Sequence, residues 1–269
     1  MALRFALNHM VAPSLGLVEF FRLAASLGIA EIEIRNDLDG RPIRDGTSPE
    51  AVRDAAARVG LAIISINALQ RFDDWTTARG REARELARYA GACEARGLVL
   101  VPTHDGSGGA GGEGQTRLRL ALRALEPILA DQGILGLVEP LGFATCSLRS
   151  KREAAEAIEE IGGGQRFRLV HDTFHHALAR EPEVYPALTA LIHVSGVTDP
   201  TARLADLRDS HRGLVDAGDR LDAAGQIGAL VAGGYAGPVS FEPFAAEVHA
   251  LANPAGAIRA SMDYLTTRP

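Results

Sequence analysis

Eight short apolar segments alternate with amphipathic segments along the whole 269-residue chain. The apolar segments, interpreted as strands, are 4–9, 31–35, 62–68, 98–104, 135–140, 168–173, 191–196 and 238–244. The amphipathic segments, interpreted as helices, are 15–28, 48–59, 77–96, 116–132, 150–162, 182–189, 222–234 and 254–266. Repeated strand-then-helix units predict a parallel sheet, and eight of them close naturally into a (β/α)8 TIM barrel. No Pro- or Ser-rich linker interrupts the series, so we expect residues 1–269 to form one α/β domain.

Local signals agree with this division. Ser48-Pro49 and Asn253-Pro254 each combine a capping residue with a proline at the first helical position, which is typical of a helix start. The Gly-rich stretch DGSGGAGGEGQ (105–115) follows the fourth predicted strand. It lacks the GxxxxGK[ST] pattern and the GxGxxG pattern before a helix, so we interpret it as a flexible lid or linker rather than a phosphate cradle.

Composition excludes several classes of protein. A net charge of −6, with arginines scattered through helical stretches, does not favour a nucleic-acid-binding surface. No apolar run approaches the roughly 18 residues of a membrane span, and the N-terminus does not resemble a signal peptide. Two cysteines imply no disulfide framework. We therefore expect a cytoplasmic enzyme acting on a small molecule, with no membrane partner; the oligomeric state is left open.

Four potential metal ligands each close an apolar run. LGLVE ends at Glu139, FRLVHD at Asp172, ALIH at His193 and PVSFE at Glu242. A carboxylate or imidazole at the end of a buried strand is costly unless something compensates it. Four such positions on separate strands predict that the strand ends converge on one ion.

Strand parity indicates which side chains face the barrel axis, because alternate side chains of a strand point to opposite sides. On this basis Glu139 and Glu242 point inward. The predicted inward residues of the second and third strands are Glu33, Arg35, Ser65 and Asn67, and the predicted outward ones are Ile32, Ile34, Ile64 and Ile66. Polar groups then gather at the C-terminal ends of the strands, where the active sites of TIM barrels lie.

Three carboxylates and one imidazole cannot all lie together without a compensating charge. A divalent cation supplies it, and this donor set suits Mn²⁺, Mg²⁺, Co²⁺ or Zn²⁺, among which the sequence does not choose. A substrate with a carbonyl oxygen beside a hydroxyl would chelate such an ion. The ion would then acidify the intervening C–H and stabilise the enediolate, while a ligand carboxylate moves the proton.

Other polar residues are predicted near this centre. His175, three positions after Asp172, and Arg212, after the seventh strand, are expected to contact substrate oxygens. His171 is predicted to face outward and to be structural. Glu33 and Asn67 are expected to orient their neighbours. The predicted walls of the substrate site are Asn8, His9, Arg35, Asn67, Phe72 and Trp75, of which Arg35 and Asn67 are our candidates for substrate binding.

Each of these residues also has an ordinary structural interpretation. A single acid at a strand end often bonds loop backbone, a lone buried histidine is more often a core residue, and Arg212 alone would be a loop salt-bridge residue. Only the joint occurrence of the four candidate ligands favours a metal site.

A family resemblance extends from the second to the eighth predicted strand. It is carried by EIEIRND, SINALQRF, VLVP, LVEPLGFATC, VHDTFHH, LIHVSG, DSHRGLVDAGD and PVSFEPF. These segments resemble the xylose isomerase-like TIM barrels of sugar isomerases and epimerases, most closely the inosose (2-keto-myo-inositol) isomerase branch of inositol catabolism.

The resemblance implies metal ligation by Glu139, Asp172, His193 and Glu242 and substrate contact by His175 and Arg212. In related ketose epimerases two glutamates act as acid and base, which implies that Glu139 and Glu242 are the proton-transfer pair. Those epimerases carry a further Glu six residues after the first ligand, where this chain has Thr145. This departure weakens a keto-hexose 3-epimerase assignment.

The leading hypothesis is a divalent-metal-dependent isomerase of a cyclic polyol ketone or a small keto sugar. The alternatives are a keto-sugar epimerase or a dehydratase of inosose or 3-dehydroshikimate in the same superfamily. An endonuclease IV-like enzyme would need more ligands and a basic groove. A silent sugar-binding barrel would have no need of four convergent polar groups.

Overall fold

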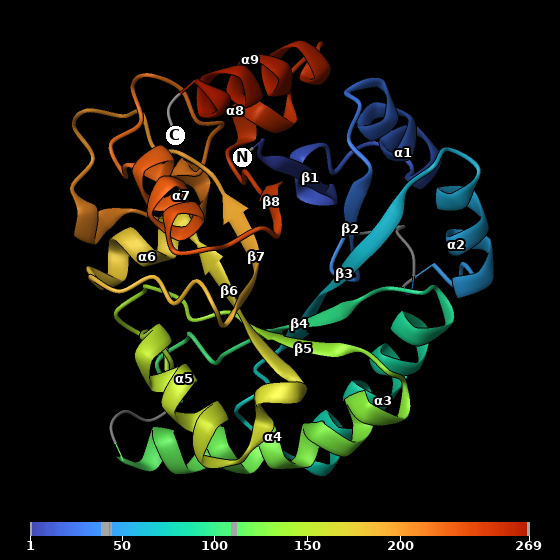
Figure 1. Ribbon diagram of the computed structural model, residues 1–269, viewed down its shortest axis with the longest axis vertical. Coiled ribbons are helices and arrows are strands. Elements are labelled where there is room, and N and C mark those ends of the chain that lie inside the picture. Colours follow the sequence, from blue (N-terminus) through green and yellow to red (C-terminus); the bar gives the residue numbers. More distant parts are fainter. Residues whose placement is uncertain (1, 39–42, 44, 109–111, 268–269) are drawn as a thin grey trace.

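Eight parallel strands close into a barrel in chain order, with β1 paired to β8 (Figure 1). The computed structural model describes residues 2–38, 43, 45–108 and 112–267. The strands are β1 Arg4–Asn8, β2 Glu31–Arg35, β3 Ala62–Gln70, β4 Gly97–Val101, β5 Leu135–Val138, β6 Phe167–Asp172, β7 Thr189–Val194 and β8 Pro238–Phe241. The predicted (β/α)8 TIM barrel is confirmed.

Helices surround the strands on the outside of the barrel (Figure 1). They are α1 Leu17–Ser26, α2 Pro49–Ala57, α3 Thr77–Ala92, α4 Gly112–Asp131, α5 Lys151–Glu160, α6 Thr173–Ala179, α7 Ala223–Ala232, α8 Ala246–His249 and α9 Pro254–Thr266. Both predicted caps are present: Ser48 Oγ accepts from the Ala51 amide and Asn253 Oδ1 from the Gly256 amide. Among the described helices, none has the length and apolar character needed to cross a membrane.

The helix predicted at 182–189 is wrong. After β6 the helix is α6, which begins at once because the Asp172 carboxylate accepts a hydrogen bond from the His175 amide at 3.0 Å. Residues 182–188 are not helical in the structure, and this stretch contains Pro182 and Pro186, which cannot donate a backbone hydrogen bond. The early helix start brings His175 to the end of the barrel that carries Asp172.

Two main groups of apolar side chains form the core, with a third, small group of Phe174, Val197, Leu207 and Leu221 beside them. The larger group lies between the strands and the helices and includes Ile32, Ile34 and Ile66, as parity predicts. The smaller group comprises ten buried residues, none of them in a helix, and fills the inside of the barrel: Ala6, Ile64, Ala68, Val99, Val101, Leu137, Leu141, Cys146, Val170 and Leu191.

The prediction that Ile64 faces outward is therefore wrong. Its cause is a register shift between β2 and β3: Ile32 pairs with Ile63, but Glu33 pairs with Ser65. The extra residue, Ile64, breaks the strict alternation and joins the interior group. Beyond the shift the predicted alternation resumes, with Ser65 bonded inside to Glu33.

The Gly-rich stretch 105–115 is shorter as a loop than predicted. Helix α4 already begins at Gly112, so its last four residues are helical rather than part of a lid or linker. Residues 105–108 form a bend in which the Asp105 carboxylate accepts from the Ser107 amide at 3.0 Å and pairs with Arg71. Residues 109–111, on which the flexible-loop prediction also rests, lie outside the described residues.

Candidate metal centre

The four predicted ligands meet at the C-terminal ends of the strands. Glu139 directly follows β5, Asp172 closes β6, His193 lies near the end of β7, and Glu242 directly follows β8. These strands are neighbours in the barrel, so their C-terminal ends share one edge. One ligand atom from each residue lies within 4.8 Å of all the others, and all four side chains are buried.

This arrangement fits a metal ion. Ligand atoms about 2.0–2.2 Å from an ion lie about 4.4 Å apart when they are opposite each other and about 3–3.6 Å apart otherwise. The four candidate ligands, called the quartet below, therefore need to move somewhat closer together to hold an ion. Three carboxylates and one imidazole match the donors that Zn²⁺, Mn²⁺, Mg²⁺ and Co²⁺ accept. The buried cluster of Glu, Asp and His residues can therefore hold a divalent ion.

His193 lies between carboxylates on both sides of its ring. Its Nδ1 is 2.8 Å from Glu139 Oε1 and 3.3 Å from Glu242 Oε2, and its Nε2 is 3.1 Å from Glu33 Oε2. The Nδ1 atom therefore faces the other candidate ligands, while Nε2 contacts Glu33 on β2. A hydrogen bond to the nitrogen that does not bind metal fixes the ring orientation in metal sites.

Glu33 is fully buried and held by a set of short hydrogen bonds. Its Oε2 accepts from Ser65 Oγ at 2.6 Å and Asn67 Nδ2 at 2.7 Å, and its Oε1 accepts from Ser240 Oγ at 2.5 Å. Burial by itself would raise the pKa of Glu33, but the His193 charge and these hydrogen bonds lower it to about 2. The carboxylate is therefore a fixed negative group behind His193, which agrees with the orienting role expected of it.

Without an ion, His193 provides the positive charge that the cluster needs. Burial lowers the pKa of this imidazole, but Glu242, Glu33 and Glu139 together raise it well above its usual value. Burial raises the pKa of Glu139, and the charges of Glu242 and Asp172 act in the same direction, opposed by His193. A metal ion that binds there therefore has to displace the proton of His193 Nδ1.

Arg212 contacts two of the four candidate ligands. Its Nη2 lies 2.5 Å from Asp172 Oδ2 and 2.9 Å from Glu242 Oε2, and its Nη1 lies 3.2 Å from Asp209 Oδ1. The guanidinium stacks on the Phe244 ring at 4.5 Å. The structure thus brings Arg212 to the candidate metal centre, where it bonds two of the candidate ligands.

Arg35 and Asn67, the two further candidates for substrate binding, are both buried at the same end of the barrel. Arg35 Nη1 donates to Glu242 Oε1 at 2.7 Å, and its other nitrogens bond Asp37. Asn8 also donates to Glu242 Oε1, at 3.2 Å. Asn67 Nδ2 donates to Glu33 Oε2 at 2.7 Å. In this structure its amide therefore helps to hold the carboxylate that contacts His193 Nε2.

His175 is buried on α6 with its Nδ1 lacking any hydrogen-bond partner in the described part of the chain. Its ring meets the edge of Phe143 at 5.0 Å between centroids. Burial, with the nearby charge of Arg212, lowers the pKa of His175 well below its usual value, so the ring is neutral. An unpartnered neutral imidazole at this position can bond a substrate oxygen. His171, in contrast, faces outward and contacts Gln226 of α7 at 2.9 Å, as predicted.

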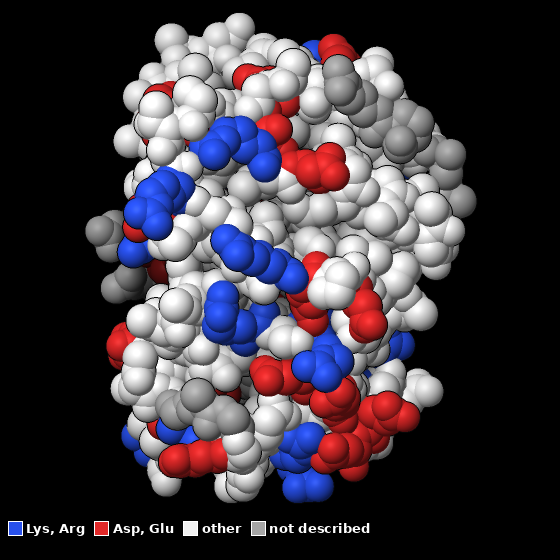
Figure 2. Space-filling view, turned by 90° about the vertical axis from the view of Figure 1, so that its left-hand side faces the viewer, with Lys and Arg blue, Asp and Glu red and all other residues white. Residues whose placement is uncertain are grey.

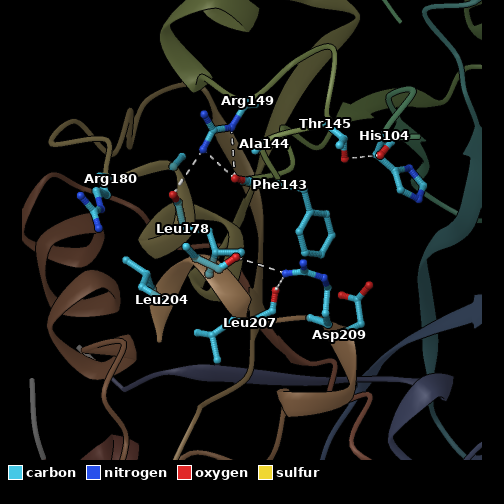
Figure 3. Close-up of a pocket in the computed structure, with 14 residues that line it drawn as sticks. His104, Phe143, Ala144, Thr145, Arg149, Leu178, Arg180, Leu204, Leu207 and Asp209 are labelled. Carbon is cyan, nitrogen blue, oxygen red and sulfur yellow. Dashed lines mark hydrogen bonds between the residues drawn. The ribbon is translucent and has the colours of Figure 1, made fainter. Parts of the chain in front are cut away.

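A cavity of about 670 Å³ lies near the quartet, between the loops that follow β4 and β5, the end of α6 and the segment that follows β7 (Figure 3). Its lining residues are His104, Gly142, Phe143, Ala144, Thr145, Arg149, Leu178, Ala179, Arg180, Leu204, Ala205, Leu207, Arg208 and Asp209. The quartet does not line it directly. Phe143 against His175 and Asp209 against Arg212 connect the cavity with the candidate metal centre.

Two residues of this centre were not singled out from the sequence. Ser240 bonds Glu33, beside the predicted inward residue Ser65, and Asp209 bonds Arg212. Side chains alternate between the two faces of a strand, so PVSFE places Ser240 on the same face of β8 as Glu242. This pattern could have identified Ser240 from the sequence. Asp209 lies in the long segment after β7, in the short 3-10 helix Asp209–His211, and no sequence pattern marks it.

Solved structures resemble the whole chain. A xylose isomerase domain containing protein from Salmonella typhimurium LT2 is 32% identical, with 98% of this chain and 96% of that chain covered and a TM-score of 0.89. The IOLI protein, solved with a binding zinc atom, is 19% identical over 99% of both chains, with a TM-score of 0.85. A D-allulose 3-epimerase from Methylomonas sp., in complex with D-allulose, is 18% identical over 99% of this chain and 95% of that chain, with a TM-score of 0.69.

The comparison with curated proteins gave no match. The family described as xylose isomerase-like TIM barrel matches residues 21–268. This range contains every strand that contributes a candidate ligand. The chain therefore belongs to the xylose isomerase-like TIM barrel family.

Proposed function

We propose that the protein is a divalent-metal-dependent isomerase of a cyclic polyol ketone or a small keto sugar, with an inosose as the leading candidate substrate. The observation that carries the proposal is the convergence of Glu139, Asp172, His193 and Glu242 within 4.8 Å at the C-terminal end of the barrel. When bound there, a divalent ion supplies Lewis-acid polarisation of a substrate carbonyl. The zinc atom in the IOLI structure supports a metal at this position, and zinc, manganese, magnesium and cobalt all remain candidates.

Glu139 and Glu242 are the proposed proton-transfer pair. They come from β5 and β8, and one oxygen of each lies within 3.3 Å of the same imidazole nitrogen of His193. A substrate carbon between them is within reach of both carboxylates. One carboxylate takes the proton from the hydroxyl-bearing carbon beside the carbonyl, and a proton returns to the former carbonyl carbon. The hydroxyl proton passes to the former carbonyl oxygen, so that the carbonyl moves by one carbon.

Arg212 and His175 are the proposed substrate-orienting groups. Arg212 is fully buried and positively charged, so it stabilises negative charge that develops on a substrate oxygen. The unpartnered Nδ1 of His175 provides a neutral contact for a hydroxyl. Arg35 and Asn8 hold Glu242 from the opposite side and so fix the direction of its carboxylate.

The alternatives are a dehydratase and an epimerase of the same family. Thr145 stands where the related ketose epimerases carry an additional Glu, and its hydroxyl bonds the backbone carbonyl of His104 at 2.6 Å. The position therefore offers no carboxylate to a substrate. Within the described residues, the quartet is the only group of at least three candidate metal ligands, which gives no support to an endonuclease IV-like trinuclear site.

The test is solvent-deuterium exchange followed by NMR, with inososes and small keto sugars and each candidate metal. We expect deuterium to enter an inosose at the carbon next to the carbonyl, with metal added and without loss of water. A Glu139→Gln variant should fold but bind no metal and show no exchange. Exchange accompanied by dehydration would favour the dehydratase, and no exchange with any inosose would exclude the proposed substrate.

A further inference from the structure

The cavity beside the quartet is positively charged although the chain as a whole carries a net charge of −6. Three arginines line it: Arg149, Arg180 and Arg208. The one acid in its lining, Asp209, is engaged by Arg212 at 3.2 Å. The charges of the three arginines are therefore not neutralised by the cavity's own residues.

The three guanidinium groups retain free hydrogen-bond donors. Arg180, just after α6, makes no side-chain hydrogen bond or ion pair with the described residues, although its backbone amide bonds Ala177. Arg149 donates only to backbone carbonyls, those of Gly142 and Leu178. Arg208 likewise donates from one nitrogen to the carbonyls of Ala205 and Leu207. Bonds to carbonyls orient these side chains but leave their charge available to an anion.

The labelled arginines and the phenylalanine in Figure 3 lie on different sides of the cavity. Arg149 and Arg180 lie toward one side of the cavity, while Phe143 and Asp209 lie on the other side. Phe143 touches His175, and Asp209 touches Arg212, which contacts two candidate ligands. A molecule in the cavity can therefore face the metal centre at one end and Arg149 and Arg180 at the other, with Arg208 next to Asp209 in the chain. Basic side chains are also conspicuous across the face in Figure 2, with acidic side chains most dense toward its lower right.

We propose that this cavity is an anion-binding subsite, and that the substrate carries a phosphate ester or a carboxylate on the part farthest from its reacting carbonyl. The proposal rests on the proposed function, since it takes the quartet as the place of reaction. A planar guanidinium bonds both kinds of anion with two parallel N–H groups. The volume of about 670 Å³ is within the range of small-molecule sites and exceeds what a bare six-carbon ring needs.

Arg180 and Arg208 are the proposed specificity-determining residues. Both are exposed, and neither has a carboxylate partner among the described residues. Their substitution therefore removes no buried ion pair, and a Gln side chain can occupy the same exposed positions. Arg88 on α3 is a matched control, because it is also an exposed arginine but does not line the cavity.

The test is calorimetric titration of the full-length, metal-loaded protein with matched non-reacting pairs. The pairs are myo-inositol 1-phosphate against myo-inositol, and methyl α-D-glucopyranosiduronate against methyl α-D-glucopyranoside, none of which has a free carbonyl. We expect the anionic member to bind about tenfold more tightly or better, a preference that weakens as salt is raised. Arg180→Gln and Arg208→Gln should each reduce the preference several-fold, and the double variant should abolish it. Arg88→Gln should leave it intact.

Metal content measured on every variant separates loss of the subsite from loss of the metal centre. Equal binding of neutral and anionic members would overturn the proposal, as would a preference that survives in the double variant with its metal intact. Binding does not require turnover, so the subsite is tested even if no inosose exchanges deuterium. Conversely, exchange of neutral inososes with no anion preference would leave the proposed isomerase and remove only the subsite.

Discussion

Nε2 of His193 on β7 lies 3.1 Å from Oε2 of Glu33 on β2, across the inside of the barrel. Glu33 itself is held by Ser65, Asn67 and Ser240 and keeps its negative charge, with its pKa at about 2. The pair fixes which nitrogen of His193 faces the quartet.

Changing Glu33 to Gln should therefore weaken metal binding although Glu33 is not itself one of the predicted ligands. Loss of such an outer partner typically costs about 10–100-fold in metal affinity. Competition with a chelator measures the affinity. Glu31→Gln is the control on the same strand, because Glu31 pairs with Arg4 and Arg96 and contacts none of the quartet. Equal affinity in the Glu33 variant and the wild type would contradict the proposed role.

Metal affinity should rise with pH. In the ion-free protein the surrounding carboxylates raise the pKa of His193 well above its usual value of about 6.5. The charged imidazole then stabilises the ion-free fold fully below that usual value, and this contribution is lost as pH rises through the raised pKa. A metal must displace the Nδ1 proton, so binding should release a proton.

Calorimetry of metal binding in buffers of different ionisation enthalpy measures this release. An affinity independent of pH between about 6 and 8, without proton release, would show that His193 is not a ligand.

Arg212→Gln should destabilise the ion-free protein strongly. The substitution leaves the buried carboxylates of Asp172 and Glu242 without their shared guanidinium, and breaking a buried pair in this way costs about 3–5 kcal/mol. Denaturant unfolding measures the loss. Added metal should recover part of it because the ion supplies the missing positive charge. Arg168, an arginine whose guanidinium bonds only backbone carbonyls, provides the control Arg168→Gln.

Asp172 has two separable roles. Its Oδ1 caps α6 at the His175 amide, and its Oδ2 faces Arg212. Asp172→Asn should preserve the cap, since Asn is an equally good N-cap, but weaken metal binding. Asp172→Ala should weaken metal binding and also cost about 1 kcal/mol from the lost cap. Parallel measurement of metal content and unfolding distinguishes the two roles. Equal stability of the two variants would show that the cap contributes nothing.

Much of the fold is readable from the sequence because its signals are local. The β-then-α repetition predicts the barrel, and helix caps such as Ser48 depend only on neighbouring residues. The failures arise where tertiary contacts override these signals. Ile64 turns inward because of the register shift between two strands, and the predicted helix at 182–189 is replaced by α6, which Asp172 starts.

The sequence by itself determined the four candidate ligands, because each ends an apolar run and all must then lie at one end of a parallel barrel. Only the tertiary structure decided what surrounds them. Glu33 and Arg35 on β2, Asp209 after β7 and Ser240 on β8 meet their partners across large distances in the chain, and no local pattern specifies which ones touch. The charged cavity is likewise built from three loops and the end of α6. Its shape and charge depend on how the barrel brings those loops together, which strand and helix periodicity does not encode.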